Sequence, residues 1–100
     1  MTHKILYEVA LSIDSDIRDL YLEWLDEHVQ EILRLPGFTQ AKIWSSDEGD
    51  TVCQYTLDSR SDLDRYLKED APRFRQDGVS RFGGKFKATR RILELQRSFD

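Results

Sequence analysis

Apolar residues occupy every second position between residues 5 and 11, a spacing that predicts a β-strand. One face of this strand holds Ile5, Tyr7, Val9 and Leu11. The other face carries Leu6 and Ala10 beside Glu8, so it is only partly polar. We therefore expect both faces of the strand to be covered.

The spacing then changes to the three- and four-residue period of an amphipathic helix. The helix is expected to begin at a cap on Asp14 or Ser15 and to run to about Leu33, and Pro36 and Gly37 end it. Its apolar stripe consists of Ile17, Leu20, Tyr21, Trp24, Leu25, His28, Val29 and Ile32.

Two further strands are predicted over residues 38–44 and 51–57, with a hairpin turn around Gly49. Strict alternation in the first of them places one set of side chains on one face: Phe38, Gln40, Lys42 and Trp44. Ser59 and Asp62 form a capping pair for a second helix, which Pro72 breaks or restarts. A further helical turn or two is expected over residues 73–82. Gly83 and Gly84 end that helix before a last strand over residues 85–95.

The order β-α-β-β-α-β predicts a single α+β domain over residues 1–100, with a four-stranded antiparallel sheet and both helices on one face. The strands carry apolar residues on both faces, so the face without helices needs a cover. We expect that cover to be the same face of a second copy, which gives an isologous homodimer. Trp44, at a strand end, is a candidate anchor for the partner.

Composition narrows the function classes. The formal net charge of -4 disfavours nucleic acid as a partner. The sequence has one cysteine, Cys53, which excludes an internal disulfide and a multi-cysteine metal site. No signal peptide and no apolar run long enough for a bilayer is evident, so we expect a cytoplasmic protein without membrane contact.

Several short motifs, taken in order, are similar to one bacterial family. They are Trp24-Leu25-Asp26-Glu27-His28-Val29-Gln30-Glu31-Ile32-Leu33, Gly37-Phe38-Thr39, Gln54-Tyr55, Tyr66-Leu67 and Arg81-Phe82-Gly83, with Phe86 and Arg90-Arg91. The chain resembles the domain of unknown function 4286 family over nearly its whole length. The resemblance implies a ferredoxin-like protomer whose sheet pairs with that of a second copy in a dimeric α/β-barrel.

That wider group includes cofactor-independent monooxygenases, haem-handling proteins, dechlorinating enzymes and ligand-binding domains. Likeness at this level is a weak argument for any one activity. Three functions therefore stay open: a homodimer that binds a small molecule between helices and sheet, a cofactor-independent monooxygenase-like enzyme, and an interaction module without a pocket. Whether the chain is an enzyme is uncertain, and we expect no cofactor.

The candidate ligand-binding residues are Trp24, His28, Gln54, Tyr66, Phe86 and Arg90. His28 is a weak candidate for a catalytic base, because imidazole titrates near neutral pH, and it could also be a haem or metal ligand. The interpretation we favour is structural: a hydrogen bond from His28 to a backbone carbonyl or a tyrosine hydroxyl holds the helix on the sheet. Gln54, polar in mid-strand, is expected either in a pocket or in a hydrogen bond across the dimer. Arg90 shares a strand face with Phe86 and Ala88, so of the basic residues it is expected to reach the cavity.

The basic residues late in the chain are expected to form ion pairs with the acidic face of the helices, within or between protomers. The alternative is that this basic cluster binds phosphates or a carboxylate ligand. Cys53 is expected to be a buried thiol rather than a nucleophile. His3 and His28 do not form a metal-binding spacing, and we expect no metal site.

Overall fold

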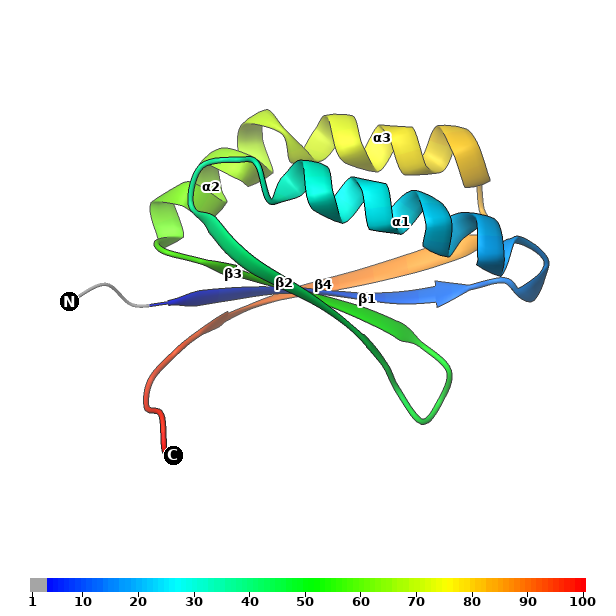
Figure 1. The fold of residues 1–100 in the computed structure, drawn as a ribbon. Helices are drawn as coiled ribbons and strands as arrows, with labels where there is room; N and C mark the ends of the chain where they lie inside the picture. Colours follow the sequence, from blue (N-terminus) through cyan, green and yellow to red (C-terminus); the bar gives the residue numbers. More distant parts are fainter. Residues whose placement is uncertain (1–3) are drawn as a thin grey trace.

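The computed structural model describes residues 4–100 and places three α-helices on one face of a four-stranded antiparallel sheet (Figure 1). His3, considered above as a ligand, lies outside the described residues. The elements are β1 (Ile5–Ile13), a 3-10 turn η1 (Ser15–Ile17), α1 (Arg18–Ile32), β2 (Phe38–Ser45), β3 (Thr51–Leu57), α2 (Arg60–Glu69), α3 (Ala71–Phe82) and β4 (Phe86–Glu94). The predicted α+β ferredoxin-like fold is confirmed.

The strand order is β2-β3-β1-β4, so the first and third strands are central. β1 pairs with β3 from Ile5 opposite Leu57 to Leu11 opposite Thr51, and with β4 from Ile5 opposite Glu94 to Ile13 opposite Phe86. The alternation of β1 and β3 sends Tyr7 and Tyr55 toward the helices, as the sequence pattern predicts.

The face assignment expected for the start of β2 is wrong. Phe38 pairs with Leu57 but Gln40 pairs with Thr56, so one extra residue forms a bulge between them. Phe38 is therefore buried beneath the helices, whereas Gln40 and Trp44 lie on the opposite face. Trp44 is 51% exposed there, on the face where a partner subunit was expected.

The first helix does not begin with the expected cap. The side chain of Asp14 makes no capping hydrogen bond, and the chain enters α1 through the 3-10 turn instead. The backbone N–H of Asp14 donates to the carbonyl of Lys85 at 2.9 Å, which ties this turn to the start of β4.

The helical segment expected over residues 73–82 is present as α3, which begins two residues earlier and is a continuous helix rather than one or two turns. Pro72 occupies the first turn of α3, where its missing N–H costs no helical hydrogen bond, and α3 follows α2 directly at Asp70. The expected cap of α2 is present, because the Ser59 hydroxyl accepts from the backbone N–H of Asp62 at 3.2 Å.

The loop that leads from α1 into β2 lies against the first turn of α2. Gly37 has φ +88°, and a Cβ atom there would lie 2.4 Å from the Cβ of Asp62. The carbonyl of Gly37 also accepts from the backbone N–H of Asp58 at 3.0 Å. Only glycine satisfies both the backbone conformation and this close approach.

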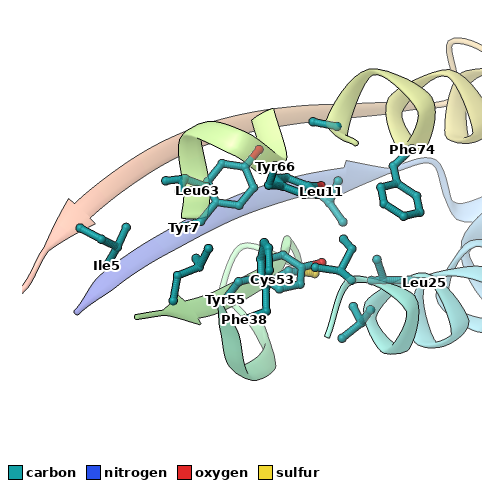
Figure 2. Close-up of a cluster of buried hydrophobic side chains, with 14 of the residues drawn as sticks. Ile5, Tyr7, Leu11, Leu25, Phe38, Cys53, Tyr55, Leu63, Tyr66 and Phe74 are labelled. Atoms are coloured by element: carbon teal, nitrogen blue, oxygen red, sulfur yellow. The ribbon is translucent and has the colours of Figure 1, made fainter. Parts of the chain in front are cut away.

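The hydrophobic core lies between the sheet and the three helices (Figure 2). Leu57, Leu63 and Ala71 are fully buried, and Tyr7, Tyr55 and Tyr66 are nearly so. Phe38 and Tyr66 meet edge-to-face with ring centres 5.1 Å apart, which fixes β2 against α2.

The opposite face of the sheet carries no helix among residues 4–100 (Figure 1). Cross-strand pairing aligns two rows there: Trp44, Val52, Ala10 and Thr89; and Lys42, Gln54, Glu8 and Arg91. In the second row Glu8 accepts hydrogen bonds from Gln54 at 3.0 Å and from Arg91 at 2.6 Å. We call this side of the sheet the open face.

Candidate functional site

A cavity of about 330 Å³ lies within the domain, between α1 and α3 on one side and the sheet on the other. Its volume is within the range of small-molecule sites. The helices contribute Tyr21, Trp24, His28, Tyr66, Phe74, Arg75 and Gly78. The strands contribute Tyr7, Cys53, Tyr55, Phe86 and Arg90. The helices and strands thus supply a wall of aromatic rings with two arginines.

The structure brings five of the six candidate ligand-binding residues to this cavity: Trp24, His28, Tyr66, Phe86 and Arg90. They come from α1, α2 and β4, segments far apart in the sequence.

Gln54 is not among the cavity residues. It alternates with the buried Cys53 and Tyr55, so its side chain lies on the open face, where it donates to Glu8. Strand geometry therefore excludes Gln54 from the pocket. The alternative expected for it, a hydrogen bond across a dimer, stays a prediction.

His28 is held by ring contacts rather than by the hydrogen bond considered for it. Its ring stacks on Trp24 with centres 4.7 Å apart and meets Phe74 edge-on at 4.9 Å. Trp24 is in turn fixed by its indole N–H, which donates to Asp77 at 3.1 Å. Among residues 4–100 we find no hydrogen bond to the His28 ring nitrogens, which leaves them available to a ligand.

Burial lowers the pKa of His28 below its ordinary value, and the charges of Glu31 and Asp77 oppose this shift only in part. The neutral imidazole is thus the form present at neutral pH. It can accept a proton or a hydrogen bond, although a catalytic role stays a prediction.

The lowered pKa of His28 predicts that the free energy of unfolding depends on pH. Between pH 6.5, the ordinary histidine value, and the lower folded-state value, the unfolded chain binds a proton that the folded chain does not. The free energy of unfolding should therefore fall as the pH drops through this window. His28→Phe should make this fall smaller, because it removes the titrating group and keeps an aromatic ring against Trp24. In a His3→Gln background, NMR titration of the remaining histidine should give a midpoint below 6.5, and a midpoint at or above 6.5 would contradict the assignment.

Tyrosine hydroxyls are the main polar groups of the deep wall. Tyr21 is 2% and Tyr66 4% exposed, and no hydrogen bond to either hydroxyl is found within the described part of the chain. Burial raises the pKa of Tyr21 to about 12 and holds that of Tyr66 still higher, so both remain protonated donors.

Arg75 is a charged cavity residue that was not among the six candidates. Its Nη2 atom donates to the hydroxyl of Tyr7 at 3.3 Å. It precedes Gly78 by three residues, and together they place one side of α3 against the cavity. The sequence analysis grouped Arg75 with the late basic residues that were expected to form ion pairs.

The expected pairing of the late basic residues holds for only some of them. Arg73 pairs with Asp70, Arg81 with Asp77, Lys85 with Asp16 and Arg91 with Glu8. Two of these acids are on α3 or its cap, one is in the 3-10 turn and one is on β1. Arg75 and Arg90 have no ion pair among residues 4–100.

Cys53 is buried, and burial raises the pKa of its thiol to about 11. This agrees with the expectation of a buried thiol that does not act as a nucleophile. Residues 4–100 contain no group of three or more His, Cys, Asp or Glu side chains arranged to hold a metal ion. No helix in this range is long and apolar enough to cross a membrane.

Solved structures with the same fold are found at low sequence identity. A candidate antibiotic biosynthesis monooxygenase from Nitrosomonas europaea is 17% identical and aligns with a TM-score of 0.67 over 91% of this chain and 90% of its own. A conserved protein from Methanosarcina mazei is 12% identical, with a TM-score of 0.73 over 92% of each chain.

A third structure has a molecule bound. The Streptomyces coelicolor monooxygenase from ActVA-Orf6, solved with nanaomycin D, is 19% identical, with a TM-score of 0.63 over 98% of this chain and 91% of its own. At these identities the likeness shows the fold alone. No curated protein matches the sequence significantly.

The family assignment comes from the sequence itself. A family model described as a domain of unknown function, DUF4286, matches residues 4–96 and so spans nearly the whole chain. The resemblance noted from the motifs is thereby confirmed, and the chain belongs to the DUF4286 family.

Proposed function

We propose that this protein is a homodimer that binds a small, largely aromatic molecule in the cavity between its helices and its sheet. The observation that carries the proposal is the cavity itself, which the chain's own side chains leave open at about 330 Å³. An interaction module without a pocket would fill this space, because protein interiors are otherwise close-packed.

The lining supports an aromatic ligand. Trp24 and His28 form a stacked pair on α1, and Phe86 of β4 packs against Tyr21 of the same helix with ring centres 5.0 Å apart. A lining this rich in aromatic rings favours an aromatic guest, since aromatic rings gain from offset or edge contacts. The Streptomyces coelicolor structure, solved with nanaomycin D, supports the capacity of this fold to hold a small molecule.

The dimer is supported by the open face. Leu6, Ala10 and Val52 are partly buried there within the protomer, and Trp44 and Leu93 are 51% and 38% exposed. These side chains form two apolar groups, one on each side of the polar row that contains Gln54, Glu8 and Arg91. Exposed apolar groups rimmed by polar residues mark a site of association. A second copy offers the same surface, which satisfies the symmetry of an isologous dimer.

The pocket is tested by filling it. Gly78 lies in mid-helix facing the cavity, and a Cβ there would meet Trp24 at 3.4 Å and Phe86 at 3.5 Å, an ordinary contact. Gly78→Leu should abolish binding of flat aromatic compounds, measured as ligand-induced rises in melting temperature. Gln76→Leu, on the same helix but outside the cavity, should leave these shifts unchanged.

Gly78→Ala is the milder companion. The variant should fold, and its free energy of unfolding should rise by about 1 kcal/mol, because glycine within a helix is destabilising relative to alanine by that amount. It should also bind more weakly than the wild type. Equal shifts for the wild type and Gly78→Leu, or no shift for the wild type with any compound, would overturn the pocket.

A further inference from the structure

We propose that the ligand of this cavity is an aromatic carboxylate whose charged group lies between the guanidinium groups of Arg75 and Arg90. The inference rests on the proposed function, because it needs the cavity to accept a ligand. It adds the chemical class of that ligand and the residues that select it.

The two arginines line the cavity from its two walls, and both residues are also exposed to solvent. Arg75 belongs to α3, and Arg90 belongs to β4 opposite Val9. No aspartate or glutamate lines the cavity, and neither arginine forms an ion pair within residues 4–100. By contrast, Arg73 and Arg81 of the same helix both pair with carboxylates. The cavity therefore holds two cationic groups without an anion.

Tyrosine hydroxyls supply further donors beside the arginines. Tyr66 lines the cavity, and its hydroxyl has no hydrogen-bond partner that we find in the described chain. This hydroxyl is not among the fully buried polar atoms, so it is accessible and can donate to a ligand oxygen or a water. Arg75, Arg90 and Tyr66 all line the cavity. The two positive charges oppose the rise that burial causes in the pKa of Tyr66.

Tyr7 completes the set. Its oxygen accepts from Arg75 at 3.3 Å, so its own O–H proton is available to donate to an acceptor. Tyr7 and Tyr66 meet edge-on, with ring centres 6.0 Å apart. Two guanidinium groups and two hydroxyls match the several lone pairs of a carboxylate, which arginine binds in charge-assisted pairs.

The rest of the cavity fits the uncharged part of such a molecule. Beyond the arginines, the walls near Trp24, His28 and Phe86 are aromatic. A volume of about 330 Å³ is near the lower end for ligand sites, which favours one or two rings over a larger skeleton. The overall net charge of -4 opposes unspecific attraction of anions, so selectivity for them has to arise locally.

The test compares acids with their uncharged amides by isothermal titration calorimetry. The pairs are benzoate with benzamide, cinnamate with cinnamamide, and naphthalene-2-carboxylate with naphthalene-2-carboxamide. We expect at least one carboxylate to bind about tenfold or more tightly than its amide, as charge-assisted hydrogen bonds are stronger than neutral ones. Arg75→Gln and Arg90→Gln should each remove that preference.

Arg60→Gln is the matched control, because it removes the same charge from an exposed pair with Asp64 on α2, outside the cavity. Circular dichroism checks that all variants fold. Amides that bind as tightly as the acids, or a preference for acids that survives both arginine variants, would overturn this inference and leave the pocket standing. Absence of binding by every acid and every amide would overturn both.

Discussion

Gly37→Ala is expected to lower the free energy of unfolding by about 2 to 4 kcal/mol. Two costs add at this position. A residue with a Cβ atom is strained at φ +88°, and the added atom would lie 2.4 Å from both the Cβ and the Cγ of Asp62. The Asp62 Cβ is attached to the first turn of α2, so the clash is relieved only when the helix or the loop moves. Urea denaturation followed by circular dichroism measures the loss.

Gly49→Ala is the matched control for this prediction. Gly49 has φ +94° in the β2–β3 turn, but an added Cβ would meet nothing within 4 Å. The free energy of unfolding of Gly49→Ala should therefore fall only by the cost of the strained backbone conformation, about 1 to 2 kcal/mol. Equal losses for the two alanine variants would show that the contact between Gly37 and Asp62 does not constrain the fold.

Val52→Glu is expected to convert the proposed dimer into a folded monomer. Val52 lies on the open face in the row with Trp44 and Ala10, at the centre of the sheet. In an isologous dimer each copy would bring one new carboxylate into an apolar contact, at a cost of several kcal/mol. Dimer affinity should fall by about 100-fold or more.

Sedimentation velocity at micromolar concentration measures this change. The wild type should sediment as a dimer and Val52→Glu at half that mass with the same circular dichroism spectrum. Leu20→Glu is the control, since Leu20 is 64% exposed on α1, away from the open face. A wild-type protein that sediments as a stable monomer would refute the dimer.

Periodicity is sufficient to predict most of this fold. β1, α1, β3 and β4 carry unbroken spacings of two or of three and four residues, and the structure places each within a few residues of the expected range. The bulge in β2 is different, because one inserted residue leaves no mark in composition and reverses the face of everything before it. The length of α3 was missed because proline was taken as a break, whereas in a first turn it is compatible with a helix.

The candidate site was likewise predicted only where local sequence spacing determines the position of a residue. Trp24 and His28 lie four residues apart on one helix, so their shared face was evident, and Phe86 and Arg90 follow from strand alternation. Gln54 was placed by its polarity although its position between Cys53 and Tyr55 indicates the opposite face. The position of Arg75 at the cavity depends on how α3 packs over the sheet. This is a tertiary property that local sequence spacing does not determine.

The hydrogen bonds of Glu8 have a consequence for partner choice. A purely hydrocarbon surface would accept any other hydrocarbon surface, and proteins in a crowded cell offer many. Here the Glu8 carboxylate is neutralised by Arg91 and accepts a hydrogen bond from Gln54, and its pKa is lowered mainly by the Arg91 hydrogen bond. A different protein that covered Leu6 and Val52 would also have to match this polar row or break its hydrogen bonds. An identical chain carries the same row, so the row favours self-association over binding to other proteins.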